Sequence, residues 1–116
     1  RTGLFPIMHT VVVQRELLKQ NPGLARKLYD GFNASKAVAE EALQAGRMED
    51  QSASMVPWLS HLYEENREVI GDDAWEFGLA ANRENIDTFL RYSYEQGVAT
   101  RRFSVEEIFA EELLDT

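Results

Sequence analysis

One histidine of this sequence lies where proton-transfer chemistry is plausible. His9 stands inside the almost fully apolar run LFPIMHTVVV, residues 4–13, and is one of two histidines in the 116-residue chain. An imidazole can donate or accept a proton near neutral pH, which suits it to general acid–base catalysis. The alternative is a core histidine that is hydrogen-bonded to a backbone carbonyl, because burying an imidazole without a partner is costly.

Two residues near His9 are candidates for binding a substrate. Arg1 could hold a carboxylate through its guanidinium fork, and Thr10 could add a hydroxyl group. Each has a simpler interpretation. Arg1 is at the end of the chain, where disorder is common. Thr10 falls on the opposite side of an extended segment from His9 and could be a packing residue.

The remaining polar and aromatic groups favour structural roles. His61 is expected to face solvent or a helix flank. Adjacent helical positions do not face each other, so the carboxylate pairs fit capping and solvated surface. Those pairs are Glu64–Glu65, Asp72–Asp73 and Glu106–Glu107. The aromatic residues that could stack on a ligand have the helical spacing of core residues, and they are Trp58, Trp75, Tyr63, Tyr92 and Tyr94.

The composition excludes several other chemistries. The chain has no cysteine, so it lacks disulfides, thiolate zinc sites and a cysteine nucleophile. Its two histidines have no matching carboxylate spacing, and there is no glycine-rich phosphate loop. We therefore expect neither a metal site nor a cofactor.

The charge distribution bears on possible partners. The chain has 12 Lys and Arg against 20 Asp and Glu, a net charge of -8. The excess of acid lies in residues 51–116, which carry 14 acidic and 5 basic side chains. Such a surface repels nucleic acid and anionic lipid, and no apolar run approaches a membrane span. We expect no nucleic-acid partner and no membrane partner.

The pattern of apolar residues predicts one strand followed by helices. The β-branched run 4–13 is typical of a strand buried on both faces. Periodic stripes and capping residues predict four to five helices, with polar residues 47–54 as a loop. We expect the helices over residues 14–20, 22–45, 56–70, 79–96 and 104–113, with Gly46, Gly71 and Gly97 as stops and a capping box at Ser104 and Glu107.

A single strand cannot satisfy its own backbone groups. Leaving its N–H and C=O groups unpaired in a buried position is costly, and residues 99–103 are a weak second strand. The strand therefore belongs to a sheet whose other strands lie outside this chain, or it pairs with a second copy. We expect residues 1–116 to be a single partial domain of a larger α/β protein, with a homodimer covering its exposed apolar faces.

Three stretches of the chain together resemble 4,5-dihydroxyphthalate decarboxylases. They are RTGLFPIMHTVVV at residues 1–13, MVPWLSHLYEENREVIGDDAW at 55–75 and GLAANRENIDTFLRYSYEQGVATRRFSVEEIFAEE at 78–112. The resemblance is to the C-terminal portion of these proteins, a group related to type II periplasmic binding proteins. It implies that the chain is the C-terminal piece of a two-lobed α/β fold with its ligand in the cleft between the lobes.

The resemblance also implies a reaction. Non-oxidative loss of CO2 from a dihydroxy aromatic acid needs an acid above the ring carbon, a base near the phenol and a cation for the retained carboxylate. It favours His9 as the proton donor, a small aromatic acid as the substrate and a cytoplasmic location. Two alternatives remain: the C-terminal part of a periplasmic solute-binding protein that serves a transporter, or a helical association module.

Overall fold

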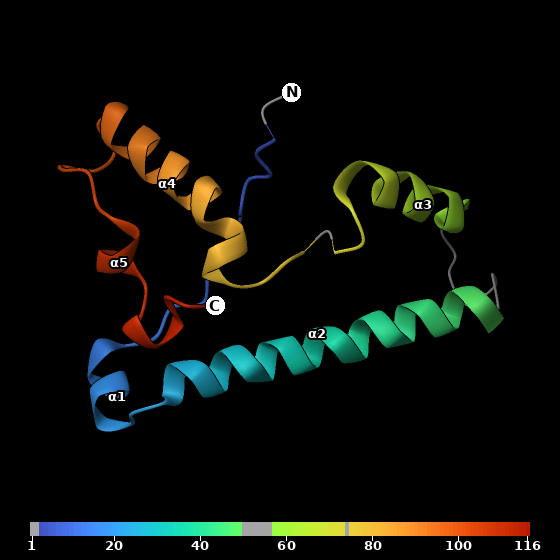
Figure 1. Ribbon diagram of the computed structural model, residues 1–116, viewed down its shortest axis with the longest axis horizontal. Coiled ribbons are helices and arrows are strands. Elements are labelled where there is room, and N and C mark those ends of the chain that lie inside the picture. Colours follow the sequence, from blue (N-terminus) through green and yellow to red (C-terminus); the bar gives the residue numbers. More distant parts are fainter. Residues whose placement is uncertain (1–2, 50–56, 74) are drawn as a thin grey trace. The chain divides into compact units, whose positions relative to one another are not determined.

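The computed structural model describes residues 3–49, 57–73 and 75–116. Its elements are helical throughout (Figure 1). They are α1 (Arg15–Gln20), α2 (Leu24–Glu49), α3 (Leu59–Ile70), α4 (Leu79–Glu95), α5 (Val105–Ile108) and the 3₁₀ turn η2 (Glu111–Leu113). The chain divides into two compact units, one taking in Arg1–Leu28 and Phe77–Thr116 and the other Tyr29–Glu76.

The expected strand over residues 4–13 is wrong. The described part of the chain contains helices, turns and irregular segments but no strand and no sheet, so the expected α/β architecture is not found in it. The expectation of a mainly helical chain is confirmed. A β-branched composition favours a strand only where a neighbouring strand pairs with it, and no described segment does so.

The segment before α1 has no regular secondary structure and exposes most of its apolar side chains. Val12 is 88% exposed, and Met8 and Val11 are also largely exposed. Large exposed apolar patches are uncommon on monomeric proteins. These exposed side chains are consistent with the expected pairing with a second copy of the chain, which stays a prediction. The assignment of residues 1–116 to a single partial domain also stays a prediction.

Most helix positions are confirmed, but several ends differ. The helix expected over 22–45 runs from Leu24 to Glu49 and passes through Gly46, so the predicted stop there is wrong. A glycine inside a helix costs only about 1 kcal/mol, which a long helix can bear. The helix expected over 104–113 ends at Ile108, and Phe109 has extended backbone angles before η2 begins.

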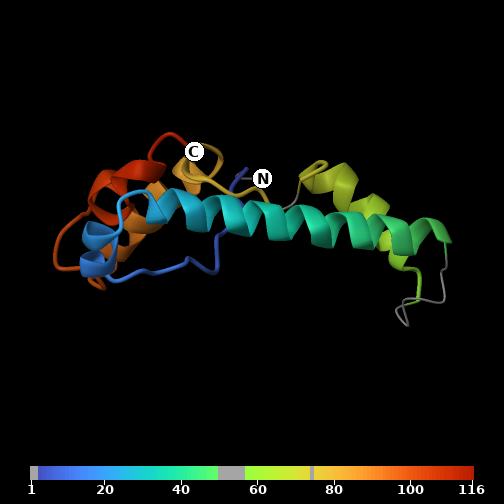
Figure 2. The same cartoon turned by 90° about the horizontal axis from the view of Figure 1, so that it is seen from below.

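The buried core lies in the unit that contains α4 and α5. It consists of Leu79, Ile86, Leu90 and Val105, with Phe103, Phe109 and Leu114 packed against it. In both views α5 lies beside α4, as these contacts require (Figures 1 and 2). The extended backbone at Phe109 ends α5 and lets the chain continue to Leu114 along the same core.

The C-terminal turn of this unit supplies acceptors to the start of α2. The Glu112 carboxylate accepts hydrogen bonds from the backbone N–H of Gly23 (2.9 Å) and of Arg26 (3.4 Å). The Arg26 guanidinium returns a bond to the Glu112 carbonyl (2.6 Å) and pairs with Asp115. Gly23 has a φ of 81°, a conformation that glycine adopts without strain. Because α2 has no acidic residue in its own first turn, Glu112 provides the missing negative charge.

The same C-terminal segment also caps α4. The Leu79 N–H donates to the Thr116 hydroxyl (3.2 Å), and the Ala80 N–H donates to the Thr116 backbone oxygen. The hydroxyl in turn donates to the Leu113 carbonyl (2.7 Å). Since α4 has no acidic residue in its first turn, its first N–H groups depend on a residue 37 positions away.

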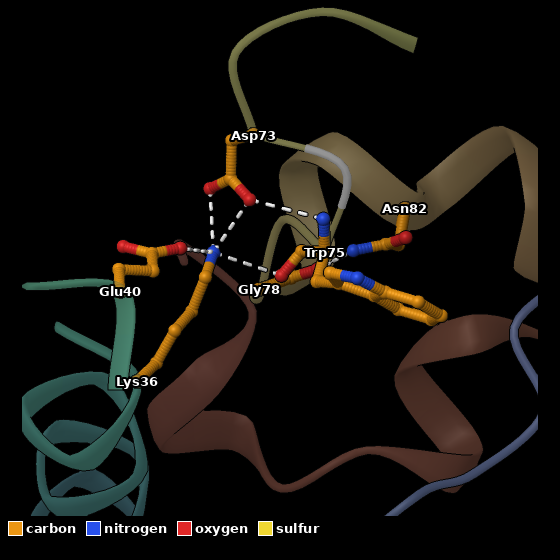
Figure 3. Close-up of polar contacts among 6 residues, drawn as sticks. All are labelled: Lys36, Glu40, Asp73, Trp75, Gly78 and Asn82. Carbon is orange, nitrogen blue, oxygen red and sulfur yellow. Dashed lines mark hydrogen bonds and ion pairs between the residues drawn. The ribbon is translucent and has the colours of Figure 1, made fainter. Parts of the chain in front are cut away.

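The second unit, Tyr29–Glu76, is organised by polar contacts. None of its described side chains is buried. Lys36 on α2 donates to both carboxylate oxygens of Asp73 (2.6 Å each) and to the Trp75 carbonyl (2.9 Å), with Glu40 at 3.6 Å (Figure 3). The Lys36 side chain is only 15% exposed, so these contacts hold Asp73 and Trp75 against α2. The lysine lowers the pKa of Asp73 mainly through this hydrogen bond.

The expected core packing of the aromatic residues is largely wrong. Trp58 is 79% exposed, and Trp75, Tyr92 and Tyr94 are also exposed, while Tyr63 is partly buried. His61 is exposed, as expected from its place on the helix. Helical spacing identifies a common face, but it does not supply a second surface to cover that face.

Replacing Leu90 by alanine should destabilise the protein far more than replacing the larger Phe89 next to it. Leu90 is 8% exposed and belongs to the core cluster, whereas Phe89 is 67% exposed. Deleting a buried leucine side chain costs about 2 kcal/mol or more of unfolding free energy. Urea unfolding of the two variants measures the difference, and a larger loss from Phe89→Ala would contradict the observed packing.

Removal of the Glu112 carboxylate should weaken the N-terminal end of α2. Glu112→Ala leaves the Gly23 and Arg26 N–H groups without their acceptor, and loss of a helix N-cap costs about 1 kcal/mol. Glu111→Ala, a change of the same charge one position earlier, is the matched control. Equal melting temperatures for the two variants would show that Glu112 does not cap the helix.

Candidate functional site

A hollow on the outer face of α4 gathers three arginines. It is a shallow, open depression of about 410 Å³ on the surface of the protein. We call it the α4 hollow, and it is lined by Ala80, Arg83, Glu84, Asp87, Thr88, Arg91 and Arg102. Three arginines and two acidic residues line it, which gives the lining a positive balance in a chain whose net charge is -8.

Helix geometry brings two of the arginines to one face. Arg83, Asp87 and Arg91 are four residues apart, so they lie one turn above another on α4. Eight residues of α-helix rise about 12 Å, which sets the spacing of the Arg83 and Arg91 backbones. Asp87 lies between them and helps to keep the pKa of Arg83 raised, although Glu106 is the main cause of that shift.

The turn after α4 brings the third arginine back to the helix. Gly97 has a φ of 73° and its N–H donates to the Tyr94 carbonyl (3.0 Å), while the Val98 N–H donates to the Ser93 carbonyl (2.9 Å). This is a Schellman ending, which requires a left-handed residue where glycine stands. It reverses the chain, so that Arg102 lines the same hollow as Arg91.

Two of the three arginines already have acidic or aromatic neighbours. The Arg83 guanidinium pairs with Glu106 on α5 and lowers the pKa of that carboxyl group. Arg91 lies 3.7 Å from Glu95 and 5.0 Å from the centre of the Tyr92 ring. Among the described residues, no ion pair or hydrogen bond involves the side chain of Arg102, which is exposed.

A neighbouring arginine, Arg101, instead serves the capping box of α5. It pairs with Glu107 (2.8 Å) and lies 4.0 Å from the centre of the Phe103 ring. Glu107 also accepts the Ser104 N–H (2.8 Å), so the predicted capping box is confirmed. Arg101 and Arg102 are adjacent in sequence but have separate roles, one in holding α5 and one in lining the hollow.

The residues singled out from the sequence are not part of this hollow. His9 and Thr10 lie in the irregular segment before α1, and both side chains are exposed. His9 is therefore not a buried imidazole. Arg1 lies outside the described residues. The roles of these three residues stay predictions.

The described residues offer little support for other kinds of site. They contain no group of three or more His, Asp or Glu side chains that could hold a metal ion. None of the helices in the described ranges combines the length and apolarity that crossing a bilayer requires. A second hollow of about 330 Å³, at the end of α3, is lined mainly by acidic side chains with Arg67.

Comparison with curated proteins finds a relative whose name states an enzymatic activity. The chain is similar to a 4,5-dihydroxyphthalate decarboxylase of Comamonas testosteroni. Identity is 37% over 111 residues, which cover 94% of this chain but 32% of that protein. The resemblance that the sequence motifs indicate is thus confirmed, and the chain spans about a third of the length of this relative. No protein-family model matches the chain, and no solved structure matches it.

The acid titration of Glu107 provides a test of the α5 anchor. Hydrogen bonds from Arg101 and the Ser104 backbone lower the pKa of Glu107 from 4.5 to about 2. A lowered pKa means that the folded state prefers the ionised form. The stabilisation is therefore complete above about pH 4.5 and is lost as the pH falls toward 2.

Arg101→Gln should raise the titration midpoint of Glu107 toward its ordinary value. The NMR chemical shift of the Glu107 carboxyl carbon measures this midpoint. Arg102→Gln, which removes the neighbouring charge without touching the pair, is the matched control. An unchanged midpoint in Arg101→Gln would exclude the arginine as the main cause of the shift.

Proposed function

We propose that this chain is part of a non-oxidative aromatic acid decarboxylase that converts a substrate of the 4,5-dihydroxyphthalate type into 3,4-dihydroxybenzoate. The observation that carries the proposal is the 37% identity over 94% of the chain to a protein of that name. The whole protein's activity needs residues from outside this chain, since the match covers 32% of the relative.

The reaction sets clear demands on the protein. A proton adds to the ring carbon that bears the leaving carboxylate, and the hydroxyl group para to that carbon loses its proton. The aromatic ring thereby becomes a dienone. The bond between the ring and the carboxylate then breaks, CO2 leaves, and its electron pair restores the aromatic ring as the phenol regains a proton. The protein must supply an acid at the carbon, a base at the phenol and a cation for the carboxylate that stays.

His9 is our candidate for the acid. Its imidazole is exposed, so it is accessible to a substrate and to the solvent that would restore its proton. Thr10 follows it in the same exposed segment and could donate a hydroxyl hydrogen bond to the substrate. Arg1 precedes His9 by eight positions in the sequence, and it is our candidate for a carboxylate-binding cation.

Replacing His9 in the full-length protein should lower turnover without lowering stability. General acid catalysis by a side chain contributes about 10²–10⁴-fold, so His9→Ala should reduce kcat by that order. An exposed side chain contributes little to packing, so the melting temperature should stay unchanged. The assay follows 3,4-dihydroxybenzoate formation from 4,5-dihydroxyphthalate.

His61→Ala is the matched control, since His61 is the other histidine of the chain and is also exposed. We expect it to keep full activity, and we expect the isolated chain to be inactive. Full activity of His9→Ala would refute the role of His9. A full-length protein that binds the substrate but releases no CO2 would refute the decarboxylase and favour a solute-binding protein.

A further inference from the structure

We propose that the α4 hollow is a binding site for a hydroxylated aromatic carboxylate, with Arg102 as its principal anion-binding residue. The choice of an aromatic ligand rests on the proposed function, but the geometry of the hollow argues for the anion independently. Its lining residues include three arginines, two acidic residues and one threonine.

The arginines fit the carboxylate end of such a ligand. A guanidinium offers parallel N–H donors that match the two oxygens of a carboxylate, which a lysine does not. Arg102 has an exposed side chain with no ion pair among the described residues, so a ligand need not displace an existing partner there. Arg91 is 3.7 Å from Glu95, a separation that leaves its donors open to a second acceptor.

The carboxylates of the lining fit the hydroxylated end. An ionised carboxylate only accepts hydrogen bonds, so Asp87 and Glu84 can accept from phenolic O–H groups. They would repel a second carboxylate, so the hollow suits the monocarboxylate product better than the dicarboxylate substrate. Thr88 is partly buried at the same place and can donate or accept. Guanidinium groups beside carboxylates therefore favour a ligand that has both an anion and hydroxyl donors.

An internal ion pair competes with the ligand. Glu106 on α5 pairs with one terminal nitrogen of the Arg83 guanidinium, so it competes with an anion for this arginine. This predicts that Glu106→Gln tightens binding, because the neutral amide holds the guanidinium less strongly. Removing any negative charge from the protein would also favour binding of an anion. A variant that loses a negative charge far from the hollow must therefore serve as a control.

Isothermal titration of the full-length protein with 3,4-dihydroxybenzoate tests the site without requiring turnover. Arg102→Gln should weaken binding by about tenfold or more, the usual effect of losing a hydrogen bond to a charged group. Arg102→Lys should recover only part of the affinity. Arg15→Gln, the same loss of charge at an exposed position of α1, should leave the affinity unchanged.

Two further comparisons complete the experiment. Glu106→Gln should bind several-fold more tightly, while Glu111→Gln, a control of equal charge, should not. Benzoate, which lacks the hydroxyl groups, should bind more weakly than 3,4-dihydroxybenzoate. Equal affinities of Arg102→Gln and wild type, or an equal loss in Arg15→Gln, would overturn the proposed site.

The outcomes separate this site from the proposed activity. A protein that decarboxylates its substrate while Arg102→Gln binds 3,4-dihydroxybenzoate normally refutes the α4 hollow and leaves the activity standing. A protein without decarboxylase activity whose binding still depends on Arg102 refutes the activity and leaves the hollow standing.

Discussion

The first N–H groups of a helix need acceptors, and in this protein the C-terminal segment provides them for two helices. Glu112 serves the start of α2, and Thr116 serves the start of α4. Neither helix has an acidic residue in its own first turn. The small core of Leu79, Ile86, Leu90 and Val105 lies next to these caps, so closure of the segment fixes both the helix ends and the packing.

The sequence predicted the helices better than it predicted their environment. Gly71 and Gly97 ended helices as expected because glycine at these positions adopts positive φ, and Ser104 with Glu107 formed the expected capping box. The strand over 4–13 failed because an apolar β-branched run shows only the preference of one segment. Whether a partner strand exists is decided elsewhere in the protein. Tyr94 has the helical spacing of a core residue but is exposed, since periodicity cannot show where the covering surface ends.

The α4 hollow shows the same contrast between local helix pattern, which the sequence reveals, and the surroundings of the helix, which it does not. The spacing of Arg83, Asp87 and Arg91 was visible in the sequence and was consistent with a decorated outer face. The contribution of Arg102 depends on the chain reversal at Gly97, and a local pattern does not reveal which distant side chain returns to the helix. A cluster of arginines in the acidic half of the chain was the signal that could have drawn attention to it.

The dependence of two helix starts on residues 112–116 has a consequence for how the protein is made. A ribosome synthesises α2 and α4 before it adds the acceptors for their first N–H groups. During translation the unit containing α4 therefore lacks its final contacts, and it can close only after the last of these residues has left the exit tunnel. Until then Leu79, Ile86 and Leu90 of α4 lack the contacts that Leu114 completes in the folded protein.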